Sequence, residues 1–209
     1  MKSIKIITAA FAVLLLSPIV LYASKVNPAT EVDFEALVRT GTAGSIEQVL
    51  KIGVVNLEEY PDALFWALYN PNPGVIRILT EHGANRHGWG STPIHVAALN
   101  LSRSGSHEIE GIPRVQLSTF LELLDVGFDI DEPSSIGTPL HLLAFLHSRD
   151  AQFVRFVRFL IEQGADVNSR RADDGMTPLM NAAYNGTPEV IEILLVAGAD
   201  INASLDITV

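Results

Sequence analysis

Residues 175–202 read GMTPLMNAAYNGTPEVIEILLVAGADIN, and this stretch decides the fold. Thr177 is followed by Pro178, an order typical of a helix N-terminus, because the hydroxyl can cap the first turn and proline needs no hydrogen bond there. A second helix is expected from Pro188, and Gly198 supplies the left-handed residue that ends it. Two helices this short cannot bury their own apolar faces, so the stretch predicts neighbours of the same kind.

Similar units precede this stretch. Two of them open on Thr-Pro and close on a glycine. In the unit before those, Asp62 stands 21 residues before Gly83, the interval that separates Thr177 from Gly198. The first unit lacks the Thr-Pro motif, and only the spacing of its apolar residues and glycines matches the other units. The positions that define the repeat are Thr92, Pro93, His95, Thr138, Pro139, His141, Thr177 and Pro178 at the starts of units, and Gly83, Gly127, Gly164 and Gly198 near their ends.

Because Thr-Pro-Leu-His at 138–141 and Gly-Ala-Asp-Val-Asn at 164–168 recur in this order, the chain resembles the ankyrin repeat family from about Phe34 to Asn202. The resemblance implies an all-α solenoid of about five helix-turn-helix units with hairpin-like turns. It also implies a protein-binding scaffold. The expected repeat domain is 34–203, with units 34–56, 57–88, 89–131, 132–169 and 170–203, followed by a tail at 204–209.

Residues 1–23 are expected to be a signal peptide or an N-terminal membrane anchor. Lys2 and Lys5 precede an uncharged run of 18 residues that ends at Ala23, a length at the border between the two kinds of segment. Cleavage after Ala23 and retention as an anchor both remain open, and a polar linker at 24–33 follows. With the lysines inside, we expect an exported, bacterial protein in the periplasm or on the periplasmic face of the inner membrane.

Charge and cysteine content exclude several classes of protein. The chain has 14 basic and 24 acidic residues, a formal net charge of −10. Such a chain repels nucleic acid phosphates and anionic lipid, so we expect no nucleic acid partner, and a membrane contact only through the N-terminal segment. The absence of cysteine excludes disulfides, thiol catalysis and cysteine zinc sites.

Two units are longer than the regular spacing. Thr92 to Gly127 is 35 residues and Thr138 to Gly164 is 26, against 21 in the last unit. The first excess lies near 99–118. Its polar character, two glycines and a proline predict a loop between two helices, either part of a binding face or a tolerated surface insertion. The second, near 146–152, is interpreted as a lengthened helix.

No catalytic, metal or cofactor site is predicted. The resemblance implies that His95 and His141 bond turn backbone and the threonine hydroxyl, which ties neighbouring units together. His82 and His87 are five residues apart, which is not the spacing of a helical zinc pair. His107 opens a metalloprotease-like sequence that lacks its second histidine. We therefore expect no enzyme and no cofactor.

The remaining candidate is a surface. In the ankyrin family the concave face is formed by turn tips and exposed positions of the first helices, and aromatic side chains on a rigid surface are typical of protein-binding hot spots. Alternatively, the insertion near 99–118 covers part of this surface and makes it ordinary core. Alignment on the Thr-Pro motif gives the expected protein-binding residues as Tyr69, Trp89, Leu99, Asn100, Phe145, Leu146, Met176, Tyr184 and Asn185.

Three functions fit such a scaffold. The first is an exported adaptor that binds a partner protein in its groove. The second is an immunity or inhibitor protein that neutralises a toxin or effector in the periplasm. The third is an auxiliary factor that supports an envelope enzyme, such as a peroxide-detoxifying one.

The last helix is unusually apolar for the end of a repeat array. Between Val190 and Ala197 the only charge is Glu192, whereas end units need polar outer faces. We therefore expect that either the tail at 203–209 or a partner covers this helix.

Overall fold

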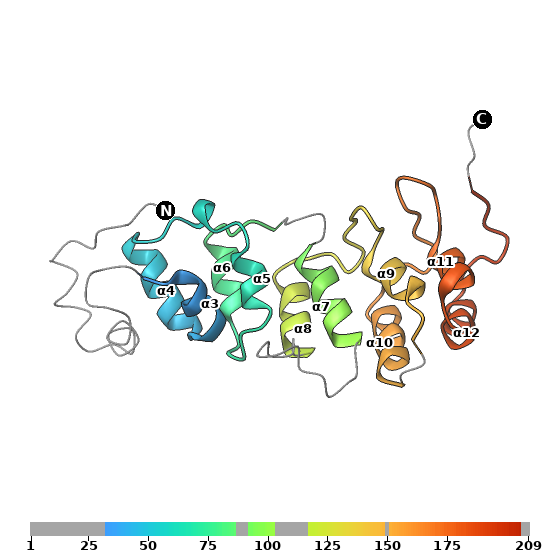
Figure 1. The fold of residues 1–209 in the computed structure, drawn as a ribbon, viewed down its shortest axis with the longest axis horizontal. Helices are drawn as coiled ribbons and strands as arrows, with labels where there is room; N and C mark the ends of the chain where they lie inside the picture. The colour runs from blue at the N-terminus through green and yellow to red at the C-terminus, as the bar shows by residue number, and fades with distance from the viewer. Residues whose placement is uncertain (1–31, 87–91, 103–116, 149–150, 206–209) are drawn as a thin grey trace. The chain divides into compact units, whose positions relative to one another are not determined.

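The structure is a computed structural model that describes residues 32–86, 92–102, 117–148 and 151–205. These residues are helical apart from turns, links and one isolated β-bridge between Ser134 and Gly137. The chain divides into two compact units, Met1–Asn85 and Arg86–Val209. Each stacks helix pairs, as the all-α repeat prediction requires (Figure 1).

The first unit holds two helix pairs. Helix α3 packs on α5, and α4 packs on α6. The buried amide of Asn70 joins the pairs, because its Nδ2 donates to the carbonyl oxygens of Val38 (2.6 Å) and Gly41 (2.9 Å). Asp62 precedes α5 but makes no side-chain capping bond to it. The elements are α3 (Phe34–Thr40), α4 (Ala43–Ile52), the 3-10 helix η1 (Leu57–Glu59), α5 (Ala63–Ala67) and α6 (Val75–Glu81).

The second unit stacks three helix pairs in two layers. The first helices α7, α9 and α11 pack in chain order, and α10 packs on α12. The Phe120 ring of α8 meets those of Phe156 and Phe159 in α10, with centroids 5.5 and 6.0 Å apart. The elements are α7 (Pro93–Ser102), α8 (Leu117–Asp125), α9 (Pro139–Phe145), α10 (Ala151–Glu162), α11 (Pro178–Asn185) and α12 (Pro188–Val196).

Local sequence sets where these helices begin and end. Thr138 and Thr177 cap α9 and α11 with their side-chain oxygens, and a proline occupies the following position. Four glycines near the ends of the second helices have left-handed backbones, a conformation that costs other residues steric energy. They are Gly83, Gly127, Gly164 and Gly198, with φ of 84°, 88°, 98° and 92°.

The prediction of a loop over 99–118 is wrong at both ends. Helix α7 continues to Ser102, and α8 already begins at Leu117. The extension is possible because residues 99–102 contain no glycine or proline, and the Ser102 hydroxyl donates to the Leu99 carbonyl at 2.8 Å. Residues 103–116 lie outside the described residues.

The other long unit contains a longer helix, as predicted. Helix α10 has 12 residues, whereas α12 has 9. Residues 146–148 before it are not helical.

The expected leader at 1–23 and most of the linker lie outside the described residues. Within the described ranges, no helix combines the length and the apolar character needed to cross a membrane. Each of the five expected repeat units contains one helix pair.

Candidate functional site

Two buried histidines link successive repeats. His95 Nδ1 lies 2.9 Å from Thr92 Oγ1, and its Nε2 donates to the Gly137 carbonyl at 2.9 Å. His141 has the same arrangement with Thr138 Oγ1 at 2.9 Å and the Met176 carbonyl at 3.0 Å. These are the contacts that the ankyrin resemblance implies.

Both imidazoles are buried, and both nitrogens of each ring have a hydrogen-bond partner. Burial lowers the pKa of His95 and of His141, and it outweighs the raising effect of the hydrogen bonds to Gly137 and Met176. Because a carbonyl oxygen only accepts, each Nε2 carries a proton, and in the neutral ring that burial favours, Nδ1 is the acceptor. Neither ring offers a free nitrogen for metal binding. Across the described ranges, no three histidine or carboxylate side chains cluster closely enough to hold a metal ion.

An exposed aromatic pair lies at the ends of α9 and α11. The Phe145 and Tyr184 rings stack with centroids 6.2 Å apart and planes 13° apart. Their exposed fractions are 41% and 78%. The two residues are 39 positions apart, the interval between the capping threonines, so they occupy equivalent sites in successive repeats. Asn185 Nδ2 donates to the Phe145 carbonyl at 3.1 Å and fixes the end of α11 against α9.

The other expected binding residues do not all join this pair. Met176 precedes α11 and Tyr184 lies in its last turn, eight positions later, so about 1.5 Å of rise per residue places them roughly 12 Å apart along the helix axis. Asn100 Nδ2 donates to a carbonyl of its own helix. Leu99, Asn100 and Leu146 are half-buried in the second unit, Tyr69 is half-buried in the first unit, and Trp89 lies outside the described residues.

The long turn before α11 is held by two arginines. The Arg171 guanidinium pairs with Asp173 at 3.0 Å and Asp174 at 2.9 Å, and this contact lowers the pKa of the Asp173 carboxyl. Arg170 Nη1 donates to the carbonyl of Ser204 at 2.8 Å. Arg170 Nη1 also lies 3.3 Å from the Gly175 carbonyl within the turn, so both arginine side chains have structural contacts.

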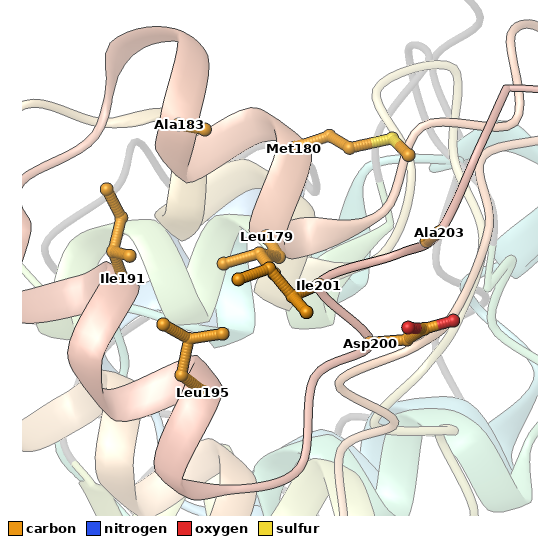
Figure 2. Close-up of a pocket in the computed structure, with 8 residues that line it drawn as sticks. All are labelled: Leu179, Met180, Ala183, Ile191, Leu195, Asp200, Ile201 and Ala203. Atoms are coloured by element: carbon orange, nitrogen blue, oxygen red, sulfur yellow. The ribbon is translucent and has the colours of Figure 1, made fainter.

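A groove lies beside the α11–α12 pair, on the side away from α9 and α10. None of its lining residues is among the predicted protein-binding residues. It has a volume of about 280 Å³ and lies between the two helices and the turn that follows them. Figure 2 shows Leu179, Leu195 and Ile201 close together in it. The signals that could have found it are Met180 in place of histidine and the apolar character of α12. This end groove is lined by Leu179, Met180, Ala183, Ile191, Leu195, Asp200, Ile201 and Ala203.

Comparison with known proteins identifies the repeat. Residues 114–204 match the family model described as ankyrin repeats (3 copies). The B-cell lymphoma 3 protein homolog of Mus musculus is 29% identical over 157 residues, 72% of this chain and 31% of that protein. Protein PhlB of Serratia liquefaciens is 41% identical over 86 residues, 39% of this chain and 34% of that protein.

A third relative is covered over most of its length. Protein phosphatase 1 regulatory subunit 27 of Mus musculus is 27% identical over 141 residues, 68% of this chain and 79% of that protein. By contrast, the chain spans about a third of the length of the other two relatives.

Proposed function

Because this chain belongs to the ankyrin repeat family, whose repeats serve as protein–protein interaction scaffolds, we propose that it is a non-enzymatic scaffold that binds a folded partner protein. The proposed binding face is formed by the exposed sides of the first helices in the second unit. The observation that carries the proposal is the stacked, exposed pair of Phe145 and Tyr184.

The aromatic pair has the properties of a binding hot spot. Aromatic side chains each bury about 150–250 Å² when covered, and they lose little conformational entropy because few torsions are free. Here the helix packing and the bond from Asn185 to the Phe145 carbonyl already fix the backbone beneath both rings. A partner that covers them therefore gains apolar burial without having to order the surface.

The test replaces both rings and leaves the repeat intact. We expect the double variant Phe145→Ala with Tyr184→Ala to weaken capture of the partner by about 2 kcal/mol or more, the usual scale for loss of a hot spot. The measurement is pull-down from the cell envelope, identification of the bound protein and titration of that protein against each variant.

A matched control removes two exposed side chains from the second helices. Arg158→Ala with Glu192→Ala changes α10 and α12 on residues that are exposed and outside the proposed face. It should keep the wild-type affinity. Equal affinities for all three proteins, each with an intact helical spectrum, would reject the proposed face.

Regulation of a bound enzyme is the second candidate function. It is favoured by the relative named as a regulatory subunit of protein phosphatase 1, most of whose length this chain covers. Under this second function, the chain is an immunity or inhibitor protein against a toxin or effector. Alternatively, it is an auxiliary factor for an envelope enzyme such as a peroxide-detoxifying one. The net charge of −10 suits a basic partner. Activity of the captured protein, assayed with and without this chain, separates inhibition from support.

Export to the cell envelope is proposed for the same protein, taken as bacterial. Its support is the uncharged run that ends at Ala23 behind Lys2 and Lys5. A reporter that is active only in the periplasm, fused after residue 60, should give a signal, and a silent fusion would contradict export. The N-terminal sequence of the purified protein then distinguishes cleavage after Ala23 from a retained anchor.

A further inference from the structure

The first helices α7, α9 and α11 contain no charged residue, although their unit is strongly acidic. Residues 86–209 hold 16 acidic and 8 basic residues. In the described part of this unit, the charges lie in the second helices and in the turns. The last turn of each first helix also lacks a basic residue. The ends of α9 and α11 therefore form an uncharged surface within an acidic unit.

The C-terminal ends of α9 and α11 carry partial negative charge. A helix has no internal partner for its last four carbonyl groups, and its aligned peptide dipoles place about half a negative elementary charge at this end. Lysine or arginine in the last turn would offset this charge, but neither helix has one. The neighbouring contacts offset it only in part: the Asn185 amide donates to the Phe145 carbonyl at 3.1 Å, and His147 Nδ1 lies 3.2 Å from the Gly186 carbonyl. These ends therefore favour a cation supplied from outside the helices.

The aromatic rings at these ends attract a cation for a second reason. The faces of phenylalanine and tyrosine rings carry negative electrostatic potential, which attracts a guanidinium or ammonium group within about 6 Å of the ring centroid. The Phe145 and Tyr184 planes lie 13° apart, so the two rings present nearly parallel faces. Tyr184 is 78% exposed, which leaves its ring open to such a group. A guanidinium suits this surface best, because it is planar, stacks on aromatic faces and is more weakly hydrated than an ammonium group.

The same unit uses this combination of groups in one of its own contacts. The Cζ atom of Arg86 lies 4.1 Å from the centroid of the Phe128 ring, and its Nη2 donates to the Gly127 carbonyl just after α8. An aromatic face and a carbonyl at the end of a helix thus bind one guanidinium. The Phe145–Tyr184 pair offers the same two kinds of group at the ends of α9 and α11. The other described arginines of this unit lie in α10 and in the turn before α11, not in the helices that carry the pair.

Building on the binding face proposed above, we propose that the partner protein docks an arginine side chain on the Phe145–Tyr184 pair. The guanidinium stacks on the exposed ring of Tyr184, and its N–H groups point to the carbonyl ends of α9 and α11. The partner therefore presents an arginine beside apolar residues, and the excess of acidic residues in this unit attracts such a segment. The competing occupant is an apolar side chain, which needs the area of the rings but not their faces.

The first test uses displayed random peptides as the probe, selected on the full-length chain. Counter-selection on the Phe145→Ala, Tyr184→Ala variant keeps only the peptides that need the rings. We expect these peptides to share an arginine next to apolar residues. Replacement of that arginine by citrulline, which has a similar shape without the charge, should lower the affinity roughly 5- to 30-fold. Peptides that share no arginine, an unchanged affinity with citrulline, or the recovery of no peptide overturn the proposal.

The second test separates the ring faces from their apolar area. Phe145→Leu with Tyr184→Leu keeps apolar side chains and removes both aromatic faces, so it should weaken the same peptides roughly 5- to 30-fold as well. Tyr184→Phe keeps an aromatic face, and its affinity should stay within about twofold of the wild type. A helical spectrum and a melting curve check that each variant is folded, and the citrulline comparison requires no change in the protein.

The outcomes distinguish this proposal from the proposed binding face. If the alanine pair leaves partner binding unchanged, the face itself is wrong and the arginine site fails with it. If the alanine pair weakens binding while the leucine pair and citrulline have no effect, the face is right but its occupant is apolar. That second result overturns the arginine site alone.

Discussion

The α9–α10 and α11–α12 repeats share the same construction in different surroundings. Each begins with Thr-Pro, continues as two helices and closes on a left-handed glycine, Gly164 or Gly198. The α9–α10 repeat has a neighbour on its far side, and its Val167 is almost fully buried. The equivalent Ile201 is largely exposed. A repeat's own sequence therefore sets its helices, whereas the burial of its side chains depends on whether another repeat packs against it.

The polar contacts differ in the same way. His141 joins the α9–α10 repeat to its neighbour through the Met176 carbonyl, and the equivalent residue Met180 has no such capacity. The turn after the second helix has a parallel link, since the Asn168 side chain accepts from the Asp200 N–H at 2.8 Å. An internal repeat thus carries directional links to the next repeat, and the α11–α12 repeat has replaced one of them with a flexible apolar side chain.

The largest expected effect comes from giving each of these two positions the residue found at the other. His141→Met should lower the free energy of unfolding by about 1–3 kcal/mol, because it removes the hydrogen bonds of the buried imidazole to the Met176 carbonyl and the Thr138 hydroxyl. The reverse change, Met180→His, should alter it by less than about 1 kcal/mol, because it lies at the open groove. Urea titration followed by circular dichroism measures both. Similar costs for the two changes would mean that the link is not what distinguishes the repeats.

Adding volume to the first helices gives a smaller effect in the same direction. Ala144 is fully buried, and a Cβ added to Gly186 would lie only 2.7 Å from its carbonyl, so there is no space around it. Ala144→Leu should therefore cost about 1–3 kcal/mol of stability. Ala183→Leu, at the equivalent exposed site, should cost no more than about 0.5 kcal/mol. Thermal melts of the two variants measure the two costs. A large loss of stability for Ala183→Leu would show that the Ala183 side of α11 is covered.

The smallest expected effect concerns two threonines of the α11–α12 repeat. Thr177 Oγ1 accepts from the Met180 N–H at 3.3 Å, whereas the buried Thr187 Oγ1 has no hydrogen-bond partner among the residues that the structure describes. Thr187→Val should stabilise the protein by about 0.5–1 kcal/mol, because it removes an unpaired buried hydroxyl and keeps the side-chain shape. Thr177→Val should destabilise it by about 1 kcal/mol through loss of the cap. The measurement is the urea midpoint of each variant relative to the wild type. Shifts of the same sign for Thr187→Val and Thr177→Val would contradict the prediction.

Several features of the fold were predictable because they depend on local chemistry. The starts of α9 and α11 follow from Thr-Pro, and their partner helices end at glycines that adopt positive φ. The helix boundaries around the insertion were not predictable in the same way. Leu99–Ser102 contains no residue that stops a helix, so α7 continues past the expected start of the loop, whose glycines and proline lie further along the chain.

The candidate binding face was only partly predictable. Equal spacing from the Thr-Pro motif placed Phe145 and Tyr184 at equivalent positions, and the packing of α9 on α11 stacks their rings. The same alignment added Met176, which lies near the other end of α11. A motif alignment gives the position of a residue within its repeat, but it does not give distances along the face.

The sequence by itself determined the repeat: its period, its caps, the left-handed glycines and the histidine that joins one unit to the next. The caps and glycines depend on backbone geometry and on hydrogen bonds within a few residues, and the ankyrin resemblance implied the longer-range bond of the histidine. Only the tertiary structure decided which apolar residues are core and which are surface. Ile201 and Val167 occupy the same position in the pattern, and they differ because one has another helix pair packed against it and the other faces an open groove.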